Sequence, residues 1–110
     1  MVYRSNPLRR YIATLRCVHC GTPYVQAAHR NQGKGMGLRC SDGLEAALCP
    51  PEHFEIDQGK SLSRDERRER MDRYIVATYE QAKKRGDCPP RLFAEWTREL
   101  EIAGLLEVTA

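Results

Sequence analysis

The sequence predicts a small α+β protein, with a zinc knuckle and a short strand in its first half and two helices at its C-terminal end. Three observations predict this class. Residues 24–29 are short and β-favouring, residues 63–104 hold two stretches with apolar residues at helical spacing, and Cys17 and Cys20 form a Cys-x-x-Cys pair. The 110 residues fit one domain. We expect its core over about residues 16–60 and a helical extension over about residues 62–110.

The first half alternates between short elements and loops. Apolar residues at helical spacing predict a short helix within the first 16 residues: Leu8, Tyr11, Ile12 and Leu15. After Pro23, residues 24–29 predict a strand that ends at His29. Residues 33–37, Gly-Lys-Gly-Met-Gly, predict a loop, because alternate glycines do not hold a regular element. Residues 42–48 fit either a strand or a helical turn.

Three helices are expected after residue 48. Prolines following Cys49 favour a helix start, and that helix stops at Gly59. Ser63 and Glu66 form a capping box that begins a longer helix ending at Gly86. A last helix stops near Gly104. The apolar positions that define the two long helices are Met71, Tyr74, Ile75, Thr78 and Ala82, then Leu92, Phe93, Trp96, Leu100 and Ala103.

Composition and charge narrow the class of protein. The chain is 41% hydrophobic and 30% charged, which suits a soluble globular domain. No apolar run approaches the roughly 18 residues that span a bilayer, and the first fifteen residues lack the apolar region of a secretory signal. We therefore expect a cytoplasmic protein without a membrane partner.

The charge is unevenly distributed along the chain. The formal net charge is +3, but residues 1–41 carry seven basic side chains and no acidic one. The rest of the chain is net acidic. A basic block of this length indicates either a polyanion such as nucleic acid as partner or a solvated basic face.

The five cysteines indicate a metal site rather than a disulfide framework. Their number is odd and no secretion signal is visible, and in a reducing compartment clustered thiols bind metal or do redox work. Two thiolates in a Cys-x-x-Cys turn can bind one tetrahedral Zn²⁺. Further thiolate ligands would come from Cys49 or Cys40. A set of buried, unpaired cysteines is the alternative.

Three histidine and carboxylate positions have metal or acid–base potential. His53 and Asp57 are four residues apart, so on a helix they share one face and can bind a divalent ion together. His29, at a strand end, can accept a proton from water near neutral pH. The glycine loop that follows can bring backbone N–H groups close to phosphate oxygens, although it lacks the spacing of a nucleotide P-loop.

Taken together, these motifs resemble a known family. Ala28-His29, the Gly-Lys-Gly-Met-Gly run, Ser41-Asp42 and the spacing from Cys49 to His53 and Asp57 are similar to small prophage-encoded HNH-type nucleases, with a ββα-metal or His-Me finger core. The resemblance covers roughly residues 4–85. It implies that a two-stranded ribbon and a short helix form an HNH core that holds one catalytic divalent ion, Mg²⁺ or Mn²⁺.

The resemblance also implies roles for individual residues. His29 corresponds to the general base that activates water, and Asp42 lies near the position that orients it. His53 and Asp57 correspond to the ligands of the catalytic ion. The zinc positions correspond to Cys17, Cys20 and Cys49, and the fourth ligand is left open between Cys40, Glu52 and His19. The basic residues expected to contact nucleic acid are Arg30, Lys34 and Arg39.

The expected function is metal-dependent endonuclease cleavage of DNA, in phage or prophage DNA processing or recombination. The alternative is a zinc-stabilised nucleic-acid-binding module without catalysis. A third possibility is an interaction protein that uses the helix of Trp96 as its binding surface. The alternative for that helix is an ordinary role in the core.

Overall fold

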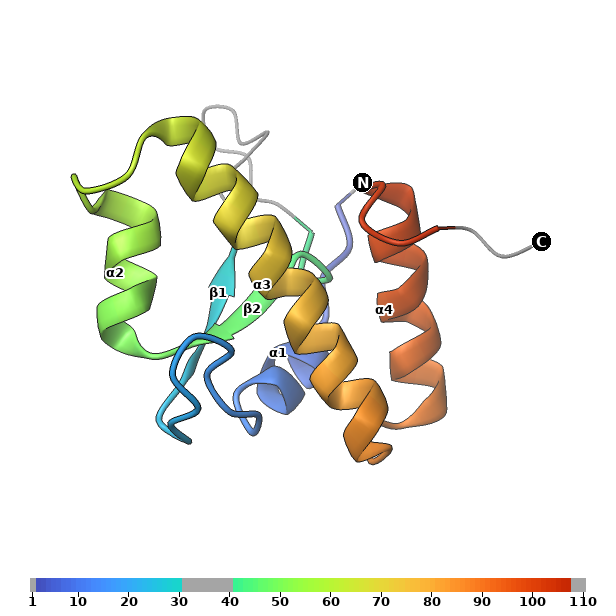
Figure 1. Cartoon of the computed structure of the whole chain (residues 1–110). Helices are drawn as coiled ribbons and strands as arrows, with labels where there is room; N and C mark the ends of the chain where they lie inside the picture. Colours follow the sequence, from blue (N-terminus) through green and yellow to red (C-terminus); the bar gives the residue numbers. More distant parts are fainter. Residues whose placement is uncertain (1, 31–40, 108–110) are drawn as a thin grey trace.

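The computed structural model describes residues 2–30 and 41–107, as a small α+β fold (Figure 1). This confirms the predicted class. The elements in chain order are α1 (Asn6–Ile12), β1 (Gln26–His29), β2 (Glu45–Leu48), α2 (Pro50–Gln58), α3 (Arg64–Arg85) and α4 (Pro90–Ile102). None of the helices within these ranges is long and apolar enough to cross a membrane.

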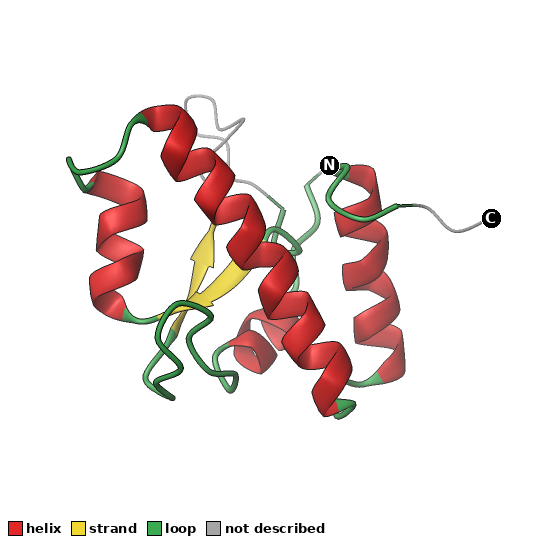
Figure 2. Cartoon of the chain, in the orientation of Figure 1, coloured by secondary structure: helices red, strands yellow, loops and turns green. Residues whose placement is uncertain are grey.

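The two strands form an antiparallel pair. Gln26 is opposite Leu48 at one end, and His29 is opposite Glu45 at the other. The second strand confirms one of the two alternatives for residues 42–48. All four residues of β2 are buried. α3 runs across the strand pair, and α1 contacts both strands and α4 (Figure 2). On the outer edge of β2, the backbone N–H of Ala47 donates a hydrogen bond to Thr78 Oγ1 of α3, at 3.1 Å.

Local sequence signals set the bounds of the helices. Both halves of the capping box between Ser63 and Glu66 are formed at the start of α3. This helix ends at Gly86, whose φ of 72° lies in the left-handed region that glycine adopts without strain. Pro50 occupies the first turn of α2, where its missing N–H has no helical partner to lose.

The helix of Trp96 belongs to the core. Trp96 is fully buried and contacts Tyr79 of α3, with ring centroids 5.3 Å apart. Its indole Nε1 donates to the carbonyl oxygen of Gly43 at 3.1 Å. A Cβ on Gly43 would lie 2.5 Å from Cβ of Glu99, so the loop before β2 approaches α4 as closely as only glycine allows. α4 therefore fixes the loop that precedes β2, and Trp96 is not an exposed interaction surface.

Candidate functional site

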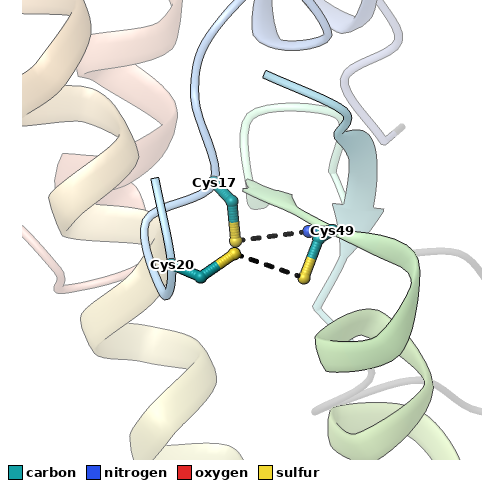
Figure 3. A group of neighbouring side chains, drawn as sticks. All are labelled: Cys17, Cys20 and Cys49. Carbon is teal, nitrogen blue, oxygen red and sulfur yellow. Dashed lines mark hydrogen bonds between the residues drawn. The ribbon is translucent and has the colours of Figure 1, made fainter. Parts of the chain in front are cut away.

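Three cysteines gather where the loop before β1 meets the start of α2. Cys17 and Cys20 lie on that loop, and Cys49 is the N-cap residue of α2 (Figure 3). Their sulfur atoms all lie within 4.8 Å of one another. The Cys20 and Cys49 sulfurs are 3.8 Å apart. Two thiolates bound to one tetrahedral Zn²⁺ at about 2.3 Å are separated by about 3.8 Å. Cys17, Cys20 and Cys49, the cysteine cluster, could therefore bind a metal such as zinc.

The backbone around the cysteine cluster favours thiolate. Cys17 Sγ accepts the N–H of His19 at 3.4 Å and the N–H of Cys49 at 3.3 Å. Burial opposes ionisation of Cys17, but hydrogen bonds from the backbone outweigh it and lower its pKa. Burial raises the pKa of the Cys49 thiol. A bound cation would stabilise both thiolates, since a metal deprotonates its thiol ligands.

The described residues supply three ligands to this cluster, and neither Glu52 nor His19 joins it as a fourth. Glu52 Oε2 instead accepts a hydrogen bond from the hydroxyl of Tyr74, and lies 3.6 Å from His19 Nδ1 and 3.6 Å from the guanidinium of Arg70. Cys40, the other candidate, lies outside the described residues.

His29 and Asp42 come together at the far end of the strand pair. His29 Nε2 lies 2.8 Å from Asp42 Oδ1. Asp42 is held in turn by the backbone N–H of Ser5, at 2.7 Å, and by Arg4, at 3.4 Å. Burial acts to raise the pKa of Asp42, but the contacts with His29 and Ser5 outweigh it and lower that pKa. Asp42 is therefore a carboxylate that fixes one nitrogen of the imidazole.

The structure adds a third member, Glu45, to this pair. Glu45 is the cross-strand partner of His29, and its Oε1 lies 3.6 Å from His29 Nε2. The side chain is fully buried, and Oε1 accepts from Arg9 Nε at 2.9 Å. The second oxygen, Oε2, is buried without a hydrogen-bond partner in the described chain. Burial raises the pKa of Glu45 to about 8. We call His29, Asp42 and Glu45 the His29 centre.

Sequence reasoning missed Glu45 because its position depends on strand register. Residues 42–48 fitted a strand or a helical turn equally well, and only the strand alternative puts Glu45 across from His29. The available signal was an acidic residue directly before the alanine pair of β2, Ala46 and Ala47.

His53 and Asp57 form a separate pair on α2. Their side chains approach to 3.2 Å between His53 Nε2 and Asp57 Oδ2, as expected for residues four apart on a helix. His53 Nδ1 lies 2.7 Å from Oε1 of Gln26. Gln26 and His29 are three positions apart on β1, and side chains alternate between the two faces of a strand. The described structure therefore does not bring His29 together with His53 and Asp57.

The basic residues expected to contact nucleic acid are only partly described. Arg30 pairs with Asp72 of α3 at 3.1 Å, and its side chain is 12% exposed. Lys34 and Arg39 lie outside the described residues. Arg4 and Arg9, which border the His29 centre, keep about two fifths of their side chains exposed, at 43% and 41%.

Comparison of the chain with family models, with curated proteins and with solved structures finds no match.

Proposed function

We propose that this chain is a divalent-metal-dependent endonuclease that hydrolyses phosphodiester bonds in DNA. The observation that carries the proposal is the contact of the His29 imidazole with the buried Asp42 carboxylate, at 2.8 Å. An imidazole held by a carboxylate is a reactive group typical of hydrolytic sites. The proposal extends to a role in phage DNA processing or recombination, which rests on the family resemblance.

His29 can serve this reaction in two ways. While Asp42 holds Nε2, Nδ1 makes no hydrogen bond within residues 2–30 and 41–107 and can accept a proton from water, because the side chain is 25% exposed. This is the general-base role, and it assigns the ion to His53 and Asp57. In the other arrangement, Nε2 binds the ion itself. In both, the ion supplies stabilisation of the charge that develops on the phosphate.

Substrate binding is assigned to the basic N-terminal part of the chain. Arg4 and Arg9 reach the surface beside the His29 centre, so a DNA phosphate near His29 would meet cationic side chains. Such contacts release counterions from DNA, and binding then weakens steeply as salt rises.

The zinc proposed for the cysteine cluster has a structural role. It would join the loop before β1 to the N-cap residue of α2, and so hold the end of the strand pair where Gln26 faces Leu48. A small chain with a modest core gains stability from such a cross-link.

A plasmid-nicking assay tests the proposal. Supercoiled DNA is incubated with the zinc-loaded protein and Mg²⁺ or Mn²⁺, and with His29→Ala at equal concentration. We expect nicking by the natural chain and a loss of about 100-fold or more in the variant, a size typical of a missing acid–base group. Tyr24→Ala is the matched control, because Tyr24 is 79% exposed and lies outside the His29 centre. Nicking that survives in His29→Ala would refute the proposal, and so would its absence in the natural chain with either metal.

The alternative, a zinc-stabilised nucleic-acid-binding module without catalysis, is favoured by one observation. This observation is the separation of His29 from the His53–Asp57 pair. The catalytic arrangement expected from the family resemblance needs His29, His53 and Asp57 around one ion. This function predicts salt-sensitive DNA binding that is equal in the natural chain and His29→Ala, with no nicking under any metal.

A further inference from the structure

We infer that His29, Asp42 and Glu45 form a binding site for one divalent metal ion of the Mn²⁺ class, through one imidazole nitrogen and two carboxylates. The inference rests on the proposed function only for the use of the ion in cleavage, since binding itself can be measured without DNA. It assigns the ion to the His29 centre rather than to His53 and Asp57.

The distances suit a shared ion. His29 Nε2 lies 2.8 Å from Asp42 Oδ1 and 3.6 Å from Glu45 Oε1, and one ligand atom from each residue falls within a common 4.8 Å limit. Adjacent ligands of an octahedral ion with bonds of about 2.1 Å are separated by about 3.0 Å. The two distances from His29 Nε2 differ from this separation by about 0.2 and 0.6 Å, so small side-chain shifts would bring both carboxylates to an ion bound at Nε2. Mixed imidazole and carboxylate ligands suit divalent ions of the first-row transition metals.

A second observation points to a missing partner. Glu45 is fully buried, and its Oε2 has no hydrogen-bond partner among the described residues. A buried polar atom without a partner costs free energy, and most such atoms in folded proteins have one. A divalent ion beside Nε2 of His29 that bound this carboxylate through both oxygens would give Oε2 the partner it lacks.

The neighbouring arginines do not prevent this binding. Arg9 holds Oε1 through Nε, and Arg4 lies 3.4 Å from Oδ1 of Asp42. A carboxylate has about four acceptor positions, so the arginine and the ion can share it. Both arginine side chains are also about two fifths exposed and can turn outward into solvent.

The His53–Asp57 pair is the weaker candidate for the same ion. It offers two ligands in the described chain, both of them more exposed than Asp42 and Glu45. If the ion lies at the His29 centre, His29 is a ligand and does not act as the proton acceptor.

The first test is titration of the zinc-loaded protein with Mn²⁺, following free Mn²⁺ by its electron paramagnetic resonance signal. We expect one Mn²⁺ per chain, an affinity lowered about tenfold or more in Glu45→Gln, and an unchanged affinity in Asp57→Asn. Glutamine keeps the shape of Glu45 and its acceptor for Arg9, and Asp57→Asn is the matched carboxylate control. Loss of binding in Asp57→Asn with retention in Glu45→Gln would overturn the inference, as would no binding by the natural chain.

The second measurement needs no variant, which guards against a misfolded Glu45→Gln protein. Mn²⁺ is paramagnetic and broadens nuclear resonances close to it, so substoichiometric Mn²⁺ should broaden the imidazole signals of His29 before those of His53. Broadening of His53 first would overturn the inference. These readouts are independent of nicking, so Mn²⁺ binding at His29 without DNA cleavage would refute the proposed function alone.

Discussion

Replacing Glu45 by Gln should change how stability depends on pH. The carboxyl of Glu45 has a pKa of about 8 in the folded chain and an ordinary value of 4.5, because burial disfavours its charged form. The folded state therefore binds its proton more tightly than the unfolded state. The contribution of Glu45 to the free energy of unfolding is therefore most favourable below pH 4.5, and it is lost as the pH rises towards 8.

The expected change in stability follows from the difference between the folded and unfolded pKa values of Glu45. Each pH unit between the two pKa values corresponds to about 1.4 kcal/mol, so the natural chain should lose about 3 kcal/mol from this group between pH 4.5 and pH 7. Above pH 8 the loss levels off at about 5 kcal/mol, which is an upper bound because water and Arg9 can relax around the charge. Glutamine does not titrate, so Glu45→Gln lacks this loss.

The assay compares chemical denaturation of the two zinc-loaded proteins at several pH values, without added Mn²⁺. The difference in free energy of unfolding should move in favour of Glu45→Gln by several kcal/mol from pH 5 to pH 8. The comparison cancels titrating groups that do not interact with Glu45. Asp42 does interact with it, and its lowered pKa acts in the opposite direction. A difference that is flat with pH would refute the assignment of a buried, proton-holding carboxyl to Glu45.

Three more outcomes are expected elsewhere in the fold. Metal analysis of protein purified without chelator should find about one zinc per chain, and Cys49→Ser should lower that content and the melting temperature, because it removes a ligand of the cysteine cluster. Gly43→Ala should destabilise the chain by about 1–3 kcal/mol in denaturation, since its Cβ would lie 2.5 Å from Cβ of Glu99; a neutral effect would contradict the close approach. Trp96→Phe should cost about 1–3 kcal/mol by leaving the Gly43 carbonyl without its indole donor, measured in the same way.

The helix boundaries could be predicted because their signals are local. The capping box at Ser63, the left-handed Gly86 and the proline after Cys49 each act within a few residues, and all three are found as expected. The gathering of Cys49 with the Cys-x-x-Cys pair was also predictable, since a zinc site needs more thiolates than one such pair provides.

The resemblance placed Asp42 beside His29, but the third member of the His29 centre, Glu45, could not be predicted because its position depends on contacts across the fold. Glu45 reaches His29 only through the antiparallel register of the two strands. Sequence spacing correctly paired His53 with Asp57 along one helix, but it carries no information about which face of β1 that helix covers. A difference of three positions between Gln26 and His29 was enough to direct their side chains to opposite faces.

The two candidate metal sites lie at opposite ends of one short strand pair, and each end is held independently. The cysteine cluster borders the end where Gln26 faces Leu48, since Cys49 directly follows Leu48. The other end is fixed by non-metal contacts: Asp42 accepts from the Ser5 backbone, and Trp96 binds the Gly43 carbonyl. Zinc loss should therefore loosen the start of α2 before it disturbs the contact between His29 and Asp42, and we expect the two proposed metals to bind and dissociate separately.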